Sequence, residues 1–150
     1  MEKKRSVTAP TVRIVQGLHA PERRQIETLL ALYRIPFEDC PDLTVMAEEG
    51  GKLTGTASLL GQRLTMVAVS PEKLRSGLVA DLLNRIIEEG RRRNLPRLDV
   101  DLFPGKGLDL VQGPDLEARV SLTTAFIIAL LDRYAEGEYS SIENTSQKGG

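Results

Sequence analysis

A short polar stretch directly before an apolar repeat has the residue types of an anion site. Arg75, Ser76 and Gly77 precede the apolar repeat that starts with Leu78 and Val79. The first backbone amides of a helix lack internal partners and carry the positive end of its dipole, so they bind phosphate readily. Gly77 removes a side chain where a ligand would approach, and Arg75 adds a cation. The alternative is that Ser76 and Gly77 only build a tight connection, and the local pattern alone favours that reading.

A strand and a long helix must position this turn. The segment Leu64–Val69 is short, apolar and β-rich, as expected of a buried strand. Pro71 cannot donate to a sheet, so the strand should end near Ser70, and Ser76 can then cap a helix. That helix should end at Gly90 and the basic residues 91–93. Its apolar stripe consists of Leu78, Val79, Leu82, Leu83, Ile86 and Ile87.

The rest of the chain predicts a mixed α/β (α+β) domain. Further strands are expected at Thr11–Val15, Leu43–Ala47, Leu53–Leu60 and Leu98–Phe103, and a helix from Pro21 to before Pro36. Short turns make the three strands between residues 43 and 69 an antiparallel meander. A right-handed crossover through the helix then places Leu98–Phe103 parallel to Leu64–Val69. Gly55 indicates a bulge or a close approach within its strand.

The C-terminal third follows a different pattern. Residues 105–114 are rich in Gly and Asp and predict a loop, and a helix should run from about Asp115 to Glu136. Within it the stretch Ala125–Leu131 is apolar all round, which is typical of a core or an interface. Residues 1–10 and 138–150 are polar and predict disordered tails, which leaves a single domain over residues 11–137.

Composition excludes several classes of function. The chain has 150 residues, 41% hydrophobic and 27% charged, as in ordinary globular proteins, and a net charge of −1 gives no overall attraction to nucleic acid. The single cysteine, Cys40, cannot form an internal disulfide or a zinc site by itself. No apolar run approaches the ~20 residues of a membrane span and no signal peptide is evident. We therefore expect no metal, no membrane and no nucleic acid, and a cytoplasmic location.

Acidic residues near the turn are the candidates for a general base. Glu72 is our candidate, and Glu48 and Glu49 are the other acids close to it in the predicted sheet. A solvated turn carboxylate is the competing interpretation of each. Asp99 and Asp101 share one face of a predicted strand and look like a carboxylate pair, although a polar sheet face explains them as well.

From Thr11 to Pro104 the chain resembles the GNAT-type acetyltransferases. The segment LTMVAVSPEKLRSGLVADLL carries the resemblance. The longer stretch that continues through RRRN is most similar to the GNAT-like N-terminal domain of citrate lyase ligases. It implies that the amides of Arg75, Ser76, Gly77, Leu78 and Val79 hold the pyrophosphate of acetyl-CoA or another acyl-CoA. It also implies that the strand containing Met66, Val67 and Val69 orients the thioester.

Two departures from the family pattern leave two functions open. Leu74 stands where Gln or Arg is usual, Val79 stands where Gly or Ala is usual, and we expect the closing β-hairpin of the family to be missing. The first function is transfer of an acetyl group from a coenzyme A thioester to a small-molecule or protein amine. The second is a non-catalytic binding or assembly module that forms a homodimer or other homo-oligomer through residues 115–136.

Overall fold

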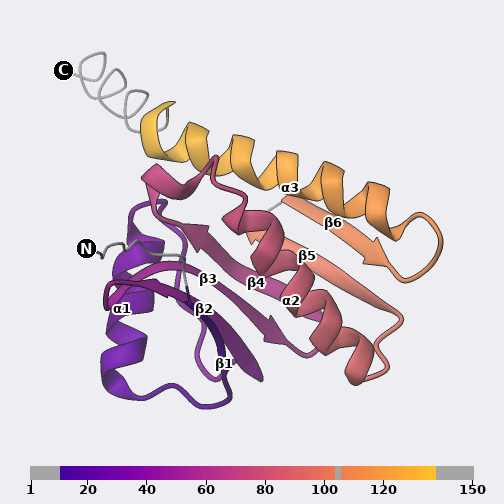
Figure 1. Ribbon diagram of the computed structural model, residues 1–150, viewed down its shortest axis with the longest axis horizontal. Coiled ribbons are helices and arrows are strands. Elements are labelled where there is room, and N and C mark those ends of the chain that lie inside the picture. Colours follow the sequence, from indigo (N-terminus) through magenta and orange to yellow (C-terminus); the bar gives the residue numbers. More distant parts are fainter. Residues whose placement is uncertain (1–10, 104–105, 138–150) are drawn as a thin grey trace, which may run out of the picture.

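A computed structural model describes residues 11–103 and 106–137. The strands form a single six-stranded sheet whose spatial order, β1-β2-β3-β4-β5-β6, is also their order along the chain. Figure 1 shows α2 and α3 on one face of this sheet and α1 on the other. The elements are β1 (Thr11–Val15), α1 (Ala20–Ala31), β2 (Leu43–Glu49), β3 (Lys52–Leu60), β4 (Arg63–Val69), α2 (Leu78–Arg92), β5 (Arg97–Phe103), β6 (Lys106–Val111) and α3 (Leu116–Asp132).

The predicted α/β architecture is confirmed. Strands β1 to β4 pair antiparallel in succession, and β5 lies parallel to β4 after the crossover through α2. The β2–β3 turn contains Gly50 and Gly51, both with positive φ (60° and 79°), as a tight hairpin requires. Each strand therefore lies beside its predecessor, and α2 is the connection that makes the one parallel pair.

The prediction of a loop over residues 105–114 is wrong for most of its length. Residues 106–111 form β6, which pairs antiparallel with β5 over the register Arg97↔Val111 to Phe103↔Lys106. Alternation along this segment is short, with Leu108 and Leu110 on one face and Asp109 on the other, and the neighbouring glycines made it look irregular. The β5–β6 hairpin precedes the last helix, whereas the family's closing hairpin follows it, and the described residues hold no strand after α3.

The start of α2 also differs in detail from the prediction. The helix begins at Leu78, and Gly77, with φ 91°, is the capping residue in place of Ser76. The Ser76 hydroxyl accepts a hydrogen bond from the Leu78 amide (3.3 Å) and donates one to the Lys73 carbonyl (2.8 Å). A 3-10 turn over Pro71–Lys73 precedes it. Ser76 thus stabilises the turn by hydrogen bonds of its hydroxyl, but it lies one residue before the capping position that the sequence predicted for it.

The apolar stripe of α2 packs against the sheet as predicted. Leu78, Val79, Leu82, Leu83, Ile86 and Ile87 are all buried. Gly55 on β3 permits this close packing, because a Cβ there would lie 2.9 Å from Leu78 Cδ2 and 3.1 Å from Leu82 Cδ1. The close approach expected at Gly55 is confirmed. Gly90 does not end the helix but lies inside it, where a Cβ would be 3.3 Å from Leu98.

Helix α3 lies against α2 and β6, and this packing buries part of its apolar surface. Ile127, Leu130 and Leu131 are buried, whereas Leu122 is 72% exposed. The helix ends at Asp132 and continues as a π-helical turn over Arg133–Gly137. None of the helices in the described parts of the chain has both the length and the apolar character needed to cross a bilayer. The predicted tails at residues 1–10 and 138–150 lie outside the described residues.

Candidate functional site

Strands β4 and β5 separate soon after they begin. Their parallel register covers only Arg63↔Asp99 and Leu64↔Val100. Two residues later Met66 has φ 56°, and the β3–β4 register shifts between Thr56 and Ser58. Such a bulge ends regular pairing and re-aims the backbone. In the described register, the edge of β4 that faces β5 therefore has no strand partner after Leu64.

The turn before α2 exposes unpaired backbone amides. The Ser76 amide donates to the Lys73 carbonyl (3.2 Å), and the Leu78 amide donates to the Ser76 hydroxyl. Within residues 11–103 and 106–137, the amides of Gly77, Val79 and Ala80 have no acceptor. The side chains of Leu78 and Val79 are buried, so only their backbone can meet a ligand. The turn has the open helix start that an anion requires.

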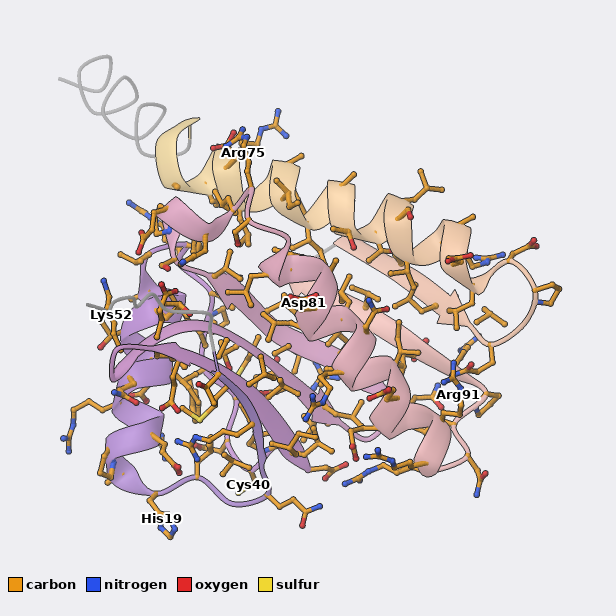
Figure 2. The ribbon with its side chains drawn as sticks, in the orientation of Figure 1. His19, Cys40, Lys52, Arg75, Asp81 and Arg91 are labelled. Carbon is orange, nitrogen blue, oxygen red and sulfur yellow. The ribbon has the colours of Figure 1, made fainter. Side chains whose placement is uncertain are left out.

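Arg75 lies at this turn beside the end of α3 (Figure 2). Its Nη2 is 3.4 Å from Asp132 Oδ2, and its side chain is 74% exposed. The pair is long and solvated, so it binds Arg75 weakly. It nevertheless places a carboxylate, and the negative end of the α3 dipole, close to the first turn of α2. A bound anion at the turn would compete with Asp132 for the guanidinium.

A groove of about 800 Å³ begins at Ala80, the last of the open amides. It runs between α2, from Ala80 to Arg91, and the first half of α3. Asn84 and Glu88 from α2 and Glu117, Ser121 and Thr124 from α3 line it, among others. The Thr124 hydroxyl is buried without a partner among the described residues. The turn thus opens beside a hollow large enough for a substantial ligand.

The side chains of the β4 residues that were predicted to orient a thioester are buried, which leaves only their backbone for contact with a ligand. Met66, Val67 and Val69 are all buried. The Val69 carbonyl already accepts a 2.6 Å hydrogen bond from the Tyr33 hydroxyl. The Met66 Sδ lies 3.2 Å from the Glu38 amide. Of the three residues, Met66 and Val67 are those whose backbone groups lie at the bulge.

Glu72 lies in the 3-10 turn directly after β4 and is not among the residues with open amides at the start of α2. The loop carboxylate is exposed, and a hydrogen bond from its own amide, followed by one from the Ser70 hydroxyl, lowers the pKa of Glu72. Charges on Lys52 and Lys73 act in the same direction. The carboxylate is therefore ionised at neutral pH, but its low pKa makes it a weak proton acceptor.

Sequence reasoning missed a second acidic group beside the bulge. Arg63 Nη2 lies 2.6 Å from Glu38 Oε1 and Arg63 Nη1 lies 2.7 Å from Asp101 Oδ2, while the Thr65 hydroxyl donates to Glu38 Oε2 at 2.9 Å. These residues lie on the sheet face opposite α2. Glu38 comes from an irregular segment before β2, so no periodic pattern could have placed it here. Asp101 joins this cluster, whereas Asp99 pairs with Gln62 and Arg97.

In the described ranges no group of three or more His, Cys, Asp or Glu residues could hold a metal ion. Cys40 is exposed.

Comparison with known proteins identifies the fold. No protein-family model and no curated protein sequence matches the chain. Among solved structures, the ribosomal-protein-alanine N-acetyltransferase from Brucella melitensis biovar Abortus 2308 superimposes with a TM-score of 0.52 and 12% identity, over 77% of this chain and 90% of that one. The chain has the GNAT fold.

Other GNAT-fold acetyltransferases match over smaller parts. The N-acetylglutamate synthase from Neisseria gonorrhoeae, solved with coenzyme A and N-acetyl-glutamate, gives a TM-score of 0.49 and 23% identity over 60% of this chain. The present chain spans only about 25% of that enzyme. A GNAT-family acetyltransferase from Desulfovibrio desulfuricans gives 0.49 and 16% identity, over 60% of this chain and 72% of its own.

Proposed function

We propose that this chain transfers an acyl group, in the first instance acetyl, from a coenzyme A thioester to an amine of a small molecule or a protein. One observation carries the proposal: β4 and β5 separate after Leu64↔Val100, beside an α2 start where the amides of Gly77, Val79 and Ala80 have no acceptor among the described residues. A free strand edge and an open helix start in succession suit an extended arm that ends in a diphosphate. We also propose that the chain shares ancestry with the GNAT-like N-terminal domain of citrate lyase ligases.

In this proposal the diphosphate lies on the amides of the α2 turn. Gly77 and Val79 offer amides, the Ser76 hydroxyl lies next to them, and Arg75 supplies a cation. Leu74, which stands where family members carry Gln or Arg, is buried, so Arg75, one step further along, would supply the charge instead. The nucleotide would extend into the groove between α2 and α3, and the pantetheine arm would follow the edge of Met66 and Val67.

The chemistry needs positioning and charge stabilisation rather than a covalent enzyme intermediate. The neutral amine nitrogen forms a bond to the thioester carbonyl carbon, and the oxyanion that develops is stabilised by a backbone amide at the β4 bulge. The C–S bond then breaks, and coenzyme A leaves with its sulfur, which takes up a proton. A base removes one proton from the amine nitrogen during the transfer.

Two carboxylates compete for the role of base. Glu72 is the candidate from the sequence, and its ionised state at neutral pH permits proton acceptance. Glu38 lies closer to the bulge, since its own amide contacts Met66 Sδ at 3.2 Å. Replacing each by Gln separates them: the true base lowers kcat with an unchanged affinity for coenzyme A, and the other residue does not.

Calorimetric titration with coenzyme A and acetyl-CoA tests the proposal directly. We expect saturable binding that Gly77→Glu abolishes, because the new carboxylate lies where the diphosphate should. The matched control is Gly61→Glu, since Gly61 also has a positive φ (65°) with open space around it but lies at the β3–β4 turn. Absence of binding to the wild-type chain, or equal losses in both variants, would overturn the proposal.

A non-catalytic assembly module is the second candidate, and the outer surface of α3 favours it. Leu122 is 72% exposed, and Ala125 and Ala129 are exposed on the same helix. A homo-oligomer through residues 115–136 would cover this surface. Sedimentation measurements of wild type and Leu122→Arg test it: an oligomer that the substitution dissociates supports the idea, and a monomer at every concentration contradicts it.

A further inference from the structure

A second hollow, on the α1 side of the sheet, has the form of a separate ligand site. It encloses about 620 Å³ between α1, the β2–β3 turn and the loop after β4. This volume lies within the range of small-molecule sites, roughly 300–1,000 Å³. The open amides of the α2 turn and the groove beside α3 contribute no wall to it. The residues that line it include Arg24, Leu29, Leu32, Lys52, Leu53 and Glu72.

The apolar part of the hollow is formed by three leucines. Leu29 and Leu53 are buried in the core, and their outer surfaces line the hollow. Leu32, at the end of α1, is 51% exposed and is among the few large apolar side chains that the fold leaves in solvent. An aliphatic or aromatic group seated here would remove this apolar area from water.

The charged part of the hollow consists of the side chains of Arg24, Lys52 and Glu72. In the described parts of the chain, the side chains of Arg24 and Lys52 make no hydrogen bond or ion pair, unlike Arg13, Arg23 and Arg63. Glu72 is exposed, and a hydrogen bond from its own amide, with smaller contributions that include the charge of Lys52, lowers its pKa. The Ser70 amide donates to the Thr54 carbonyl at 2.8 Å. The backbone next to Glu72 is therefore fixed by this hydrogen bond, and the charged side chains surround an apolar surface.

We propose that this hollow binds an apolar α-amino acid. Its carboxylate would meet Arg24, whose planar guanidinium suits bidentate binding, with Lys52 nearby. Its ammonium group would meet Glu72, and its side chain would lie on Leu29, Leu32 and Leu53. A simple apolar carboxylate would offer no cation to Glu72, and a simple amine would offer no anion to Arg24. The site concerns binding alone and does not depend on whether the α2 turn holds coenzyme A.

Titration followed by ¹H–¹⁵N NMR tests the site with three matched compounds. They are L-phenylalanine, 3-phenylpropionate, which lacks the amine, and 2-phenylethylamine, which lacks the carboxylate. We expect saturable shifts of the amides of Thr28, Lys52 and Glu72, with L-phenylalanine binding at least tenfold tighter than either analogue. Arg24→Gln should weaken the binding of L-phenylalanine and 3-phenylpropionate about tenfold, but not that of 2-phenylethylamine. Glu72→Gln should weaken the binding of L-phenylalanine and 2-phenylethylamine, but not that of 3-phenylpropionate.

A control keeps the result specific. Arg93→Gln removes the same charge from the exposed end of α2 and should change none of the affinities. No saturable shift at the hollow, shifts scattered over the surface, or equal losses in Arg24→Gln and Arg93→Gln would overturn the proposal. Equal binding of 3-phenylpropionate and L-phenylalanine would overturn it too. Coenzyme A titration of the same samples reports separately on the proposed acyltransferase function.

Discussion

The Tyr33 hydroxyl donates a 2.6 Å hydrogen bond to the backbone carbonyl of Val69. Tyr33 follows α1 and is fully buried, and Val69 is the last residue of β4. The bond joins the helix on one face of the sheet to the point where the chain leaves the sheet for the α2 turn. It also satisfies a carbonyl that β5, which has already separated from β4, cannot reach.

Tyr33→Phe should destabilise the fold by about 1–2 kcal/mol, because it leaves the buried Val69 carbonyl without a donor. Urea unfolding of wild type and variant, followed by circular dichroism, measures the difference. An unchanged midpoint and slope would show that water replaces the hydroxyl at no cost.

Alkaline pH should destabilise the wild type in a defined window. Burial, with smaller contributions from the charges on Glu72 and Asp132, raises the pKa of Tyr33 to about 12. The unfolded tyrosine, with a pKa near 10, then binds fewer protons than the folded one between these values, so the free energy of unfolding falls as the pH rises. The stabilisation is complete below about pH 10. Tyr33→Phe should remove this part of the pH dependence, and a variant that loses stability as steeply as the wild type from pH 10 upward would contradict the assignment.

Gly55→Ala should destabilise the fold by about 1–3 kcal/mol through overpacking. The new methyl would lie 2.9 Å from Leu78, 3.1 Å from Leu82 and 3.2 Å from Val69 Cγ1. Because Leu78 opens α2, the displacement should also weaken coenzyme A binding. Gly17→Ala is the control, since it has open space and no positive φ, and it should change the unfolding free energy by less than about 0.5 kcal/mol. Similar effects of the two substitutions would argue against close packing at Gly55.

Asp132→Asn should tighten coenzyme A binding about two- to threefold, or ~0.5 kcal/mol, because it frees Arg75 and removes a negative charge near the turn. Arg75→Gln should weaken binding by a similar factor, and both effects should shrink as salt is added. Calorimetry at low and high ionic strength measures them. Asp109→Asn, the same change on exposed β6, is the comparison, and an equal gain there would reveal a general charge effect instead.

Glu38→Gln should reduce stability at neutral pH by about 1 kcal/mol, because it breaks the charged network with Arg63 and Thr65. The hydrogen bond from Arg63 holds the pKa of Glu38 below its usual value, so this stabilisation exists above the ordinary glutamate pKa and is lost as the pH falls through the lowered one. Unfolding curves from pH 7 to pH 2 should therefore be flatter for the variant. Glu27→Gln, which breaks an exposed pair with Arg23, should have little effect at any pH.

Periodic segments of the sequence were predictable, and one short segment was not. The strand at Thr11–Val15 and the buried stripe of α2 appear where the residue spacing placed them. Strand β6 was missed because six residues with a glycine and two charged side chains resemble a loop, and only pairing with β5 makes them a strand. Tertiary pairing of this kind leaves little trace in local spacing.

The candidate site divides in the same way. The open amides before α2 follow from helix geometry, so Gly77 and Val79 could be named from the sequence. The cluster of Glu38, Arg63 and Asp101 could not, because Arg63 lies 25 residues from Glu38 and 38 residues from Asp101 along the chain. The position of Asp132 against Arg75, 57 residues apart, depends likewise on how α3 returns across the sheet.

The sheet order β1 to β6, identical to the order along the chain, has a consequence for how the protein reaches its fold. The connections β2–β3, β3–β4 and β5–β6 are short turns, so little loop entropy is lost when these strands are added. The connections β1–β2 and β4–β5 are longer and each runs through a helix, and the second of them is also the step that brings the cleft of the proposed acyltransferase into being. Nascent chains would thus complete a stable meander before any ligand pocket exists.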